Sequence, residues 1–148
     1  MKTDSKISAP ITILYVEDHK ETREALGVTL VRRFPAVRFI VAENGAVGLG
    51  LFQRDHPDIV MTDIDMPVLD GITMCSAIKD LAPETALIIH SACSDARRQM
   101  QAIEPGLNHF VPKPIDFDCL FHIIAASLAR ITLARESARA SHHVMACS

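Results

Sequence analysis

Acidic side chains follow two of the apolar runs in this chain, at the point where each run ends. Asp63 closes the run 58–62, and Glu17 and Asp18 follow the run 11–16. In open α/β sheets, reactive and ligand-binding groups lie at the carboxyl ends of the strands. Carboxylates gathered at one edge of a sheet repel one another, so such a cluster requires a cation or a proton. The spacing therefore predicts a cation-binding cluster made of these three carboxylates.

Two further runs end in a hydroxyl group and a cation. Ser91 follows the apolar run 86–90, and Lys113 follows the shorter run 109–111. Oxygen-only ligands suit Mg²⁺, with Mn²⁺ as the alternative. An aspartate held between Mg²⁺, a lysine and a hydroxyl group is equipped to accept a phosphoryl group, because that transfer depends mainly on alignment and charge neutralisation. We therefore predict that Asp63 is a nucleophile and that Ser91 and Lys113 complete the catalytic set.

Strand-like and helix-like patterns alternate along the chain, which is typical of βαβ units on a parallel sheet. The expected strands are Ile11–Val16, Val37–Val41, Asp58–Thr62, Ala86–His90 and His109–Val111. The expected helices are His19–Arg33, one opened by Asn44-Gly45 and running through Phe52, Gly71–Leu81, one from Ser94 or Asp95 to Glu104, and a last one capped by Asp116. With right-handed crossovers, this order predicts a single α/β domain with a doubly wound, five-stranded parallel sheet.

The last predicted helix carries one apolar stripe and then loses it. The stripe consists of Phe117, Leu120, Phe121, Ile124, Leu128 and Ile131. From Ala134 onward the residues are small and polar, so this segment is either a continuation of the helix or a frayed tail. We therefore divide the chain into an N-terminal extension, 1–10, a folded domain, 11–131, and a C-terminal helix extension or flexible tail, 132–148.

The composition is that of a globular protein with one domain. Of the 148 residues, 49% are hydrophobic and 22% are charged, and the net charge of −3 argues against direct binding of nucleic acid. We find no apolar stretch that approaches the length of a bilayer span and no signal-peptide pattern at the N-terminus. We therefore expect a cytoplasmic protein without a membrane partner.

The four cysteines form no recognisable disulfide or metal pattern. Cys75 and Cys119 fall within helical patterns, where we expect each to act as a small buried hydrophobic residue. His142, His143 and Cys147 could form a metal-binding tract, but a disordered tail explains them more simply. The cysteines therefore favour a reducing compartment.

Taken in order, the strand-end motifs resemble those of the receiver domain of two-component response regulators. The motifs are Glu17-Asp18 after the first strand, Asp63 with Met66-Pro67 and Asp70-Gly71 after the third, Ser91-Ala92 after the fourth, and Lys113-Pro114 after the fifth. The resemblance covers roughly residues 11–131. It implies a flavodoxin-like fold with strand order 2-1-3-4-5. It also implies a signalling domain, phosphorylated by a histidine kinase or a histidine phosphotransfer protein, rather than a dedicated enzyme.

The resemblance assigns roles around the metal. Asp63 would be the phosphorylated residue and, together with Asp18, a direct ligand of Mg²⁺. The backbone carbonyl of Asp65 would be a third ligand. Glu17 stands where the family commonly has Asp, and it would act through water.

The resemblance also implies a switch. Ser91 stands where Thr is more usual and keeps the hydroxyl group. Phe110 matches an aromatic switch position that is often Tyr; it can rotate but forms no new hydrogen bond. The switch would change the face formed by the fourth helix, the fifth strand and the last helix, where a homodimer or an unidentified downstream partner would bind. The Lys113–Pro114 peptide is expected to be cis.

Several other polar residues allow more than one interpretation. Asp65 lies two residues past Asp63, and we hypothesise that its carboxylate modulates how water reaches the acyl phosphate and hence the lifetime of the signal; alternatively, it is merely exposed. Asp58 is expected to face solvent or to cap the entry of its strand. His90 and His109 are expected to be hydrogen-bonded structural histidines.

Two other functions fit parts of the same pattern. Asp63 and Asp65 match the DxD that opens haloacid-dehalogenase-type phosphatases, but those enzymes place the paired acids after the nucleophile, whereas here the acidic pair comes first. This length also leaves no room for a cap domain. An interaction module that is never phosphorylated is the third interpretation, and the complete set of strand-end residues argues against it. Whether the chain acts alone or is part of a larger regulator stays open.

Overall fold

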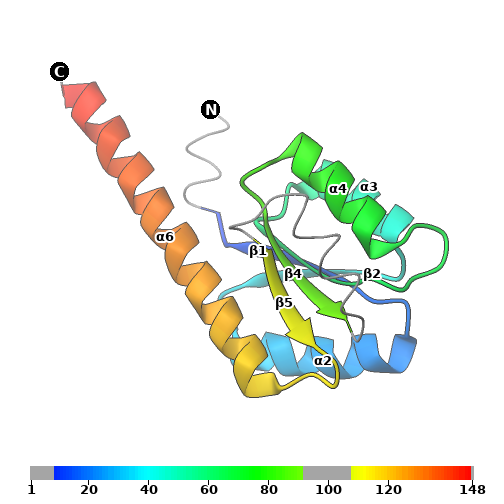
Figure 1. Cartoon of the computed structure of the whole chain (residues 1–148). Coiled ribbons are helices and arrows are strands. Elements are labelled where there is room, and N and C mark those ends of the chain that lie inside the picture. Colours follow the sequence, from blue (N-terminus) through cyan, green and yellow to red (C-terminus); the bar gives the residue numbers. More distant parts are fainter. Residues whose placement is uncertain (1–8, 92–107, 148) are drawn as a thin grey trace.

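The computed structural model describes residues 9–91 and 108–147, with side chains through Ser141. Within these ranges, five strands form one parallel sheet in the order β2-β1-β3-β4-β5, which confirms the predicted topology (Figure 1). The strands are β1 (Thr12–Val16), β2 (Arg38–Ala42), β3 (Ile59–Asp63), β4 (Ala86–Ser91) and β5 (Asn108–Pro112). The helices are α2 (Lys20–Arg33), α3 (Gly45–Asp55), α4 (Gly71–Leu81) and α6 (Phe117–Cys147). The helix predicted between 94 and 104 lies outside the described residues.

Each face of the sheet is covered by its own helices. Because successive side chains of a strand point to opposite faces, Leu14 and Val16 of β1 pack with α3 and α4, whereas Ile13 and Tyr15 pack with α2 and α6. Figure 1 shows α3 and α4 on one side of the sheet, with α2 and the first half of α6 on the other. Burial of both faces explains why the central strands appear in the sequence as unbroken apolar runs.

The predicted limits of the elements are correct to within a few residues, since β1, β2, β3 and α2 begin one residue later than predicted and several elements end later. Helix α3 continues past Phe52 to Asp55, and β4 includes Ser91. Helix α3 packs closely on β1, since a Cβ added at Gly48 would lie 2.9 Å from Cγ2 of Val16. A glycine that weakens the helix by its own propensity therefore allows the close packing of this helix on the sheet.

The parallel register brings the strand ends together at one edge. Asp63 pairs with His90, and Ser91 pairs with Pro112. The register of β1 with β3 places Glu17, the residue after β1, level with Asp63. The residues that the sequence assigned to a site therefore share the carboxyl edge of the sheet.

Helix α6 is continuous over 31 residues, so the C-terminal segment continues the helix and is not a frayed tail. Asp116 caps it, because its Oδ1 accepts the backbone N–H of Asp118 at 3.0 Å. Leu120 and Ile124 are fully buried. Among the described side chains beyond Ile131, all are exposed except that of Arg135. The distal part of α6 therefore extends beyond the sheet, as Figure 1 shows.

Arg135 fastens α6 to the amino edge of the sheet. Its Nη2 donates to both carboxylate oxygens of Asp58 at 3.1 and 3.2 Å, and its Nη1 donates to the carbonyl of Ala9 at 2.6 Å. Asp58 also accepts the backbone N–H of Thr12 at 3.0 Å. The Asp58 side chain is only 11% exposed. The prediction that it faces solvent is therefore wrong: it caps the entry of β1 and pairs with α6.

Helix α6 also contradicts the expectation that no segment reaches the length of a bilayer span. By length and composition alone, Phe117–Ser141 could span a bilayer. Its most apolar 18-residue window has a mean hydropathy of 1.5, and 17% of that window is buried inside the protein. The apolar core helix of a soluble protein meets the same criteria. The apolar stripe that ends at Ile131 is too short to indicate this segment on its own.

The cysteine predictions are half correct. Cys75 of α4 is fully buried in the core layer beneath α3 and α4. Cys119 is exposed, because it lies in the first turn of α6 on the side away from the sheet. The side chains of Cys93 and Cys147 lie outside the described part of the chain.

Candidate functional site

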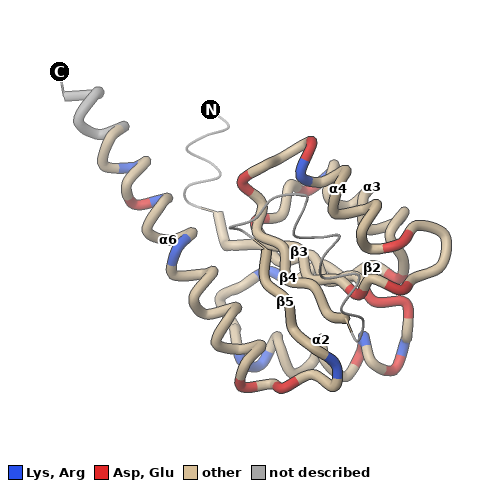
Figure 2. Tube along the Cα trace, in the orientation of Figure 1, with Lys and Arg blue, Asp and Glu red and all other residues tan. Residues whose placement is uncertain are grey.

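Three carboxylates meet at the carboxyl edge of the sheet. Glu17 and Asp18 follow β1 and Asp63 ends β3, and one oxygen of each lies within 4.8 Å of the others. Glu17 and Asp63 are buried, whereas Asp18 is exposed. Several acidic residues lie in the loops at this edge, where α2 and α4 begin (Figure 2). We refer to Glu17, Asp18 and Asp63 as the acidic cluster.

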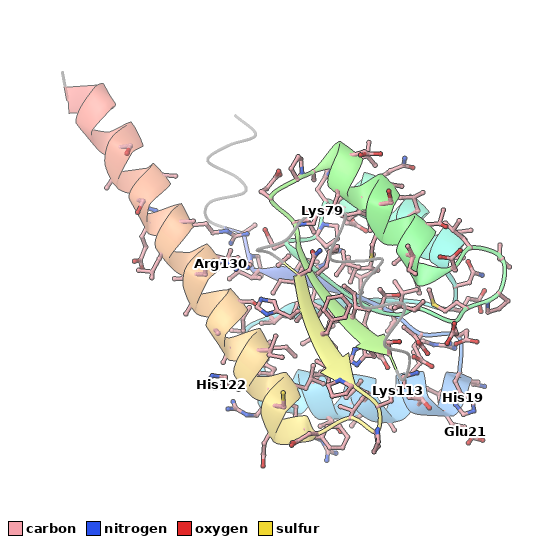
Figure 3. The ribbon with its side chains drawn as sticks, viewed as in Figure 1. His19, Glu21, Lys79, Lys113, His122 and Arg130 are labelled. Carbon is pink, nitrogen blue, oxygen red and sulfur yellow. The ribbon has the colours of Figure 1, made fainter. Side chains whose placement is uncertain are left out.

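Lys113 supplies a positive charge to this cluster. Its Nζ lies 2.5 Å from Oδ2 of Asp63, while Oδ1 of Asp63 accepts the backbone N–H of Ile64 at 2.7 Å. Figure 3 shows Lys113 and His19 at the same end of the molecule, where β5 ends and α2 begins. The Lys113–Pro114 peptide is cis, as predicted.

One lysine does not balance three carboxylates. Burial raises the pKa of Glu17, and the charge of Asp63 raises it further, whereas the backbone N–H of His19 and the charge of Lys113 lower it. The cluster therefore has an excess of negative charge that a divalent cation would relieve. Its donors are oxygen atoms only, which is the ligand chemistry that Mg²⁺ prefers.

The backbone around Glu17 is held by β2 and α2. Its N–H donates to the carbonyl of Ala42 at 3.0 Å, and its carbonyl accepts from Nη1 of Arg23 at 2.8 Å. Its Oε1 accepts the backbone N–H of His19 at 3.3 Å. His19 is the N-cap of α2, so the helix begins one residue later than predicted, and Nδ1 of His19 lies close to the N–H of Thr22. The position of the acidic pair therefore depends on the start of α2.

The backbone around Asp63 is packed against the start of α4. A Cβ at Gly71 would lie 2.2 Å from the carbonyl oxygen of Asp63, so this position accepts only glycine. Asp70 caps α4, accepting the backbone N–H of Thr73 at 2.9 Å, and this bond is the main cause of its lowered pKa. Asp70 and Gly71 therefore act as the cap and the first residue of α4.

The loop between β3 and α4 contains a strained residue. Val68 has φ of 71°, in the left-handed region that β-branched residues rarely adopt, and its side chain is 80% exposed. Asp65 in the same loop is exposed. Loops with such strain occur next to functional sites more often than elsewhere.

Ser91 lies on β4, which is the neighbour of β3, and Phe110 lies on β5, one strand farther from Asp63. Ser91 ends β4, one residue beyond the register partner of Asp63. Phe110 pairs with Ile89 and is half-buried against the core layer beneath α3 and α4. Both predicted switch residues are therefore close to the acidic cluster along the sheet edge.

A buried polar aromatic pair next to the cluster was missed in the sequence. Tyr15 and His90 are each 1% exposed, with ring centroids 6.5 Å apart. Neither ring nitrogen of His90 has a hydrogen-bond partner among the described residues, and neither does Nε2 of His109. The prediction that His90 is hydrogen-bonded is therefore wrong. Burial lowers the pKa of His90 to about 4, although the charge of Asp63 opposes this shift.

The comparisons with known proteins agree with this geometry. The response regulator receiver domain model matches residues 13–125. The chain is 35% identical over 118 residues to the transcriptional regulatory protein CseB of Streptomyces coelicolor, covering 80% of this chain and 49% of that protein. The structure is similar to the N-terminal domain of an uncharacterized protein from Wolinella succinogenes, with a TM-score of 0.73, 35% identity, and coverage of 84% and 98% of the two chains.

A more distant structure shares the fold. The receiver domain of Saccharomyces cerevisiae Ssk1, crystallised with the histidine phosphotransfer signaling protein Ypd1, has a TM-score of 0.64 at 20% identity, with coverage of 76% and 84%. The chain spans about half the length of the curated relatives it matches. The family model covers most of the chain and all strand-end residues. The chain therefore belongs to the response regulator receiver domain family, the signalling domain of two-component systems.

Proposed function

We propose that this receiver domain accepts a phosphoryl group on Asp63 and that the acyl phosphate changes its affinity for a partner. One observation carries the proposal: the carboxylate of Asp63 lies between Nζ of Lys113 and the carboxylates of Glu17 and Asp18. A carboxylate in this position can attack phosphorus while nearby positive charge neutralises the transferred oxygens.

The phosphoryl donor in this proposal is a phosphohistidine on a sensor kinase or a phosphotransfer protein. A carboxylate oxygen of Asp63 forms the new P–O bond as the P–N bond breaks, and the imidazole leaves with the electron pair. Lys113 and the hydroxyl group of Ser91 interact with the transferred oxygens. The complex of the Ssk1 receiver domain with Ypd1 supports a partner of this class.

The cation belongs to the same proposal. Asp18 and Asp63 bind Mg²⁺ directly, the backbone carbonyl of Asp65 is a third ligand, and Glu17 acts through water. When bound, Mg²⁺ supplies the positive charge that the acidic cluster lacks, and Mn²⁺ can replace it. The raised pKa of Glu17 supports this assignment, because burial and then the charge of Asp63 disfavour a second negative charge at this position.

The switch is a shift between two populations rather than a rigid movement. The hydroxyl group of Ser91 moves toward the phosphoryl group, and Phe110 rotates into the space that it leaves. The partner-binding face of this proposal consists of β5, α6 and the fourth helix that the sequence predicts, whose residues lie outside the described part of the chain. A downstream protein or a second copy of the chain binds there.

Labelling with acetyl phosphate and Mg²⁺ tests this proposal. We expect one phosphoryl group per chain, lost slowly, and none in Asp63→Asn. The matched variant Asp55→Asn, at the far end of α3, should label normally. Rapid multiple turnover would identify a phosphatase instead. A parent protein that neither labels nor binds the beryllofluoride mimic would identify an interaction module.

Asp65 carries a separate part of the proposal. Its exposed carboxylate, two residues from the acyl phosphate, modulates the access of water and hence the lifetime of the signal. The rate of dephosphorylation of labelled Asp65→Asn should differ from that of the parent. Equal rates would refute this role and leave the phosphorylation of Asp63 untouched.

We also propose the setting in which the domain acts. It works alone or as part of a larger regulator in the cytoplasm, and the domain itself binds neither nucleic acid nor membrane. The net charge of −3 supports the absence of nucleic-acid binding. A flotation assay with anionic vesicles, and a gel-shift assay with duplex DNA, should both show no binding.

A further inference from the structure

An apolar pocket lies between α2 and the edge strand β2. Its volume is about 610 Å³, which is within the usual range for pockets that bind small molecules. Val28 and Val31 of α2 and Val41 of β2 line it, and they are 54%, 52% and 50% exposed. Covering these side chains would remove apolar surface from water, so the pocket favours a ligand with an apolar body.

The floor of the pocket is next to the acidic cluster. Tyr15 lines the pocket, is 1% exposed, and lies two residues before Glu17 in β1. Burial raises the pKa of Tyr15, and the charges of Glu17 and Asp63 raise it further. The phenol ring therefore lies within electrostatic reach of both carboxylates.

Arg23 connects the wall of the pocket to the same cluster. It lines the pocket, and its Nη1 donates to the carbonyl of Glu17 at 2.8 Å. A ligand that contacts the guanidinium of Arg23 would therefore act on the loop that presents Glu17 and Asp18.

The charges around the pocket indicate the class of ligand. Two guanidinium groups, of Arg23 and Arg32, and one carboxylate, of Glu24, line it together with the apolar walls. A ligand with an apolar chain and one anionic group matches both the walls and the excess positive charge. We propose that this pocket binds a small amphiphilic carboxylate, such as a medium-chain fatty acid, with its chain against Val28, Val31 and Val41 and its carboxylate near Arg32.

Binding in the pocket has a consequence that rests on the proposed function. Because Tyr15 and Arg23 contact both the pocket and the region of Glu17, occupation of the pocket changes the rate at which Asp63 is phosphorylated. The binding itself depends only on the pocket. The two parts can therefore fail separately.

Gly27 allows the pocket to be filled without disturbing the fold. It lines the pocket, and a Cβ added there meets nothing within 4 Å. Gly50 of α3 is equally open but is not part of the pocket. Gly27→Leu should therefore fill the pocket, and Gly50→Leu makes the same change elsewhere. Both variants should unfold at temperatures at least as high as the parent, since leucine favours a helix more than glycine does.

Calorimetric titration of the full chain with decanoate, without metal, tests the binding. We expect one decanoate per chain, at least tenfold weaker binding of butyrate, and at least tenfold weaker binding of decanoate by Gly27→Leu than by Gly50→Leu. Arg32→Gln should weaken decanoate several-fold. Absent binding, equal binding by both leucine variants, or many decanoates per chain would overturn the proposal.

Sedimentation of the same variants tests the competing occupant. If the parent and Gly50→Leu form a dimer that Gly27→Leu does not, a second copy covers the pocket and the proposal is overturned.

The labelling rate tests the coupling between the pocket and Asp63. Saturating decanoate should change the rate of acetyl phosphate labelling at least twofold in the parent and not in Gly27→Leu. An unchanged rate refutes the coupling. A complete lack of labelling refutes the proposed function, while the calorimetric result still decides the pocket.

Discussion

The two edges of the sheet differ in how far their carboxylates are balanced by positively charged groups. At the amino edge, the carboxylate of Asp58 meets the guanidinium of Arg135 and the backbone N–H of Thr12. At the carboxyl edge, the three carboxylates of the acidic cluster face the single ammonium group of Lys113. The first edge is electrostatically balanced and holds distant segments together. The second keeps an imbalance that a cation relieves, which is the arrangement expected where binding and chemistry occur.

Binding of Mg²⁺ at the carboxyl edge should have the largest effect on the free energy of unfolding. A cation that binds only the folded protein stabilises it by about 2.7 kcal/mol at one hundred times its dissociation constant. Urea unfolding followed by circular dichroism should show this gain for the parent and for Asp58→Ala, and a much smaller gain for Asp18→Asn. If Mg²⁺ does not change the free energy of unfolding of the parent, the assignment of uncompensated negative charge to the carboxyl edge is wrong.

Breaking the balanced edge should destabilise the fold without affecting the site. In Asp58→Ala, the N–H of Thr12 loses its partner, and the guanidinium of Arg135 loses its carboxylate and keeps only the carbonyl of Ala9. We expect a loss of about 2 kcal/mol, below the usual cost for fully buried pairs because Arg135 is partly exposed. Asp55→Ala, which breaks the pairs with the exposed side chains of Arg54 and Arg38, is the control and should lower the urea midpoint much less. Equal midpoints for the two variants would show that the amino edge contributes nothing.

The pH dependence of stability separates two groups at the carboxyl edge. The pKa of His90 is lowered to about 4, so its contribution to stability is present above its ordinary pKa of 6.5 and is lost as the pH falls through about 4. Glu17 has a raised pKa, so its contribution is present below its ordinary pKa of 4.5 and is lost as the pH rises through the folded value. As the pH rises from about 4, the free energy of unfolding therefore increases through the deprotonation of His90 and decreases through the ionisation of Glu17.

Replacing His90 should reveal its part of this dependence. His90→Leu removes ring nitrogens that have no partner among the described residues, and it should gain about 1–2 kcal/mol at pH 5 relative to the parent. The gain should shrink toward pH 7. Glu17→Gln should instead flatten the loss on the alkaline side in metal-free protein. Parallel curves of unfolding free energy against pH for His90→Leu and the parent would show that this histidine is not held neutral by the fold.

Relieving the strain at Val68 should have the smallest effect. Val68→Gly removes a β-branched side chain from the left-handed region and should stabilise the protein by about 0.5–1 kcal/mol. Val47→Gly, at an exposed valine within α3, should destabilise it by a similar amount. Thermal unfolding of the two variants would decide the matter, since equal shifts of the same sign would mean that the loop is not strained.

The residues of the site could be predicted because each lies next to a strong local signal. Apolar runs located β1, β3 and β4, and a parallel sheet necessarily brings their carboxyl ends to one edge. Glu17, Asp18, Asp63 and Lys113 needed no knowledge of side-chain directions to be placed together. The cap at Asp70 and the close approach at Gly71 follow from equally local rules.

What could not be predicted depends on contacts between distant segments. Asp58 and Arg135 are 77 residues apart, and nothing local marks them as partners. The exposure of Cys119 depends on how α6 is rotated against the sheet. Tyr15 and His90 were visible as polar residues inside apolar runs, but only the register shows that His90 pairs with Asp63 and that Tyr15 pairs with Met61, two residues before it. Burial without a hydrogen bond is a property of the packed interior and has no sequence signature.

The length of α6 gives it the mechanics of a lever. At 1.5 Å per residue, its 31 residues span about 46 Å, and the packing from Leu120 to Ile131 together with the pair at Arg135 holds only the part nearer the sheet. The part of the helix beyond Arg135 extends for about 18 Å. A small tilt of the packed part beside β5 would therefore displace the C-terminal end of α6 by more than it displaces the packed residues.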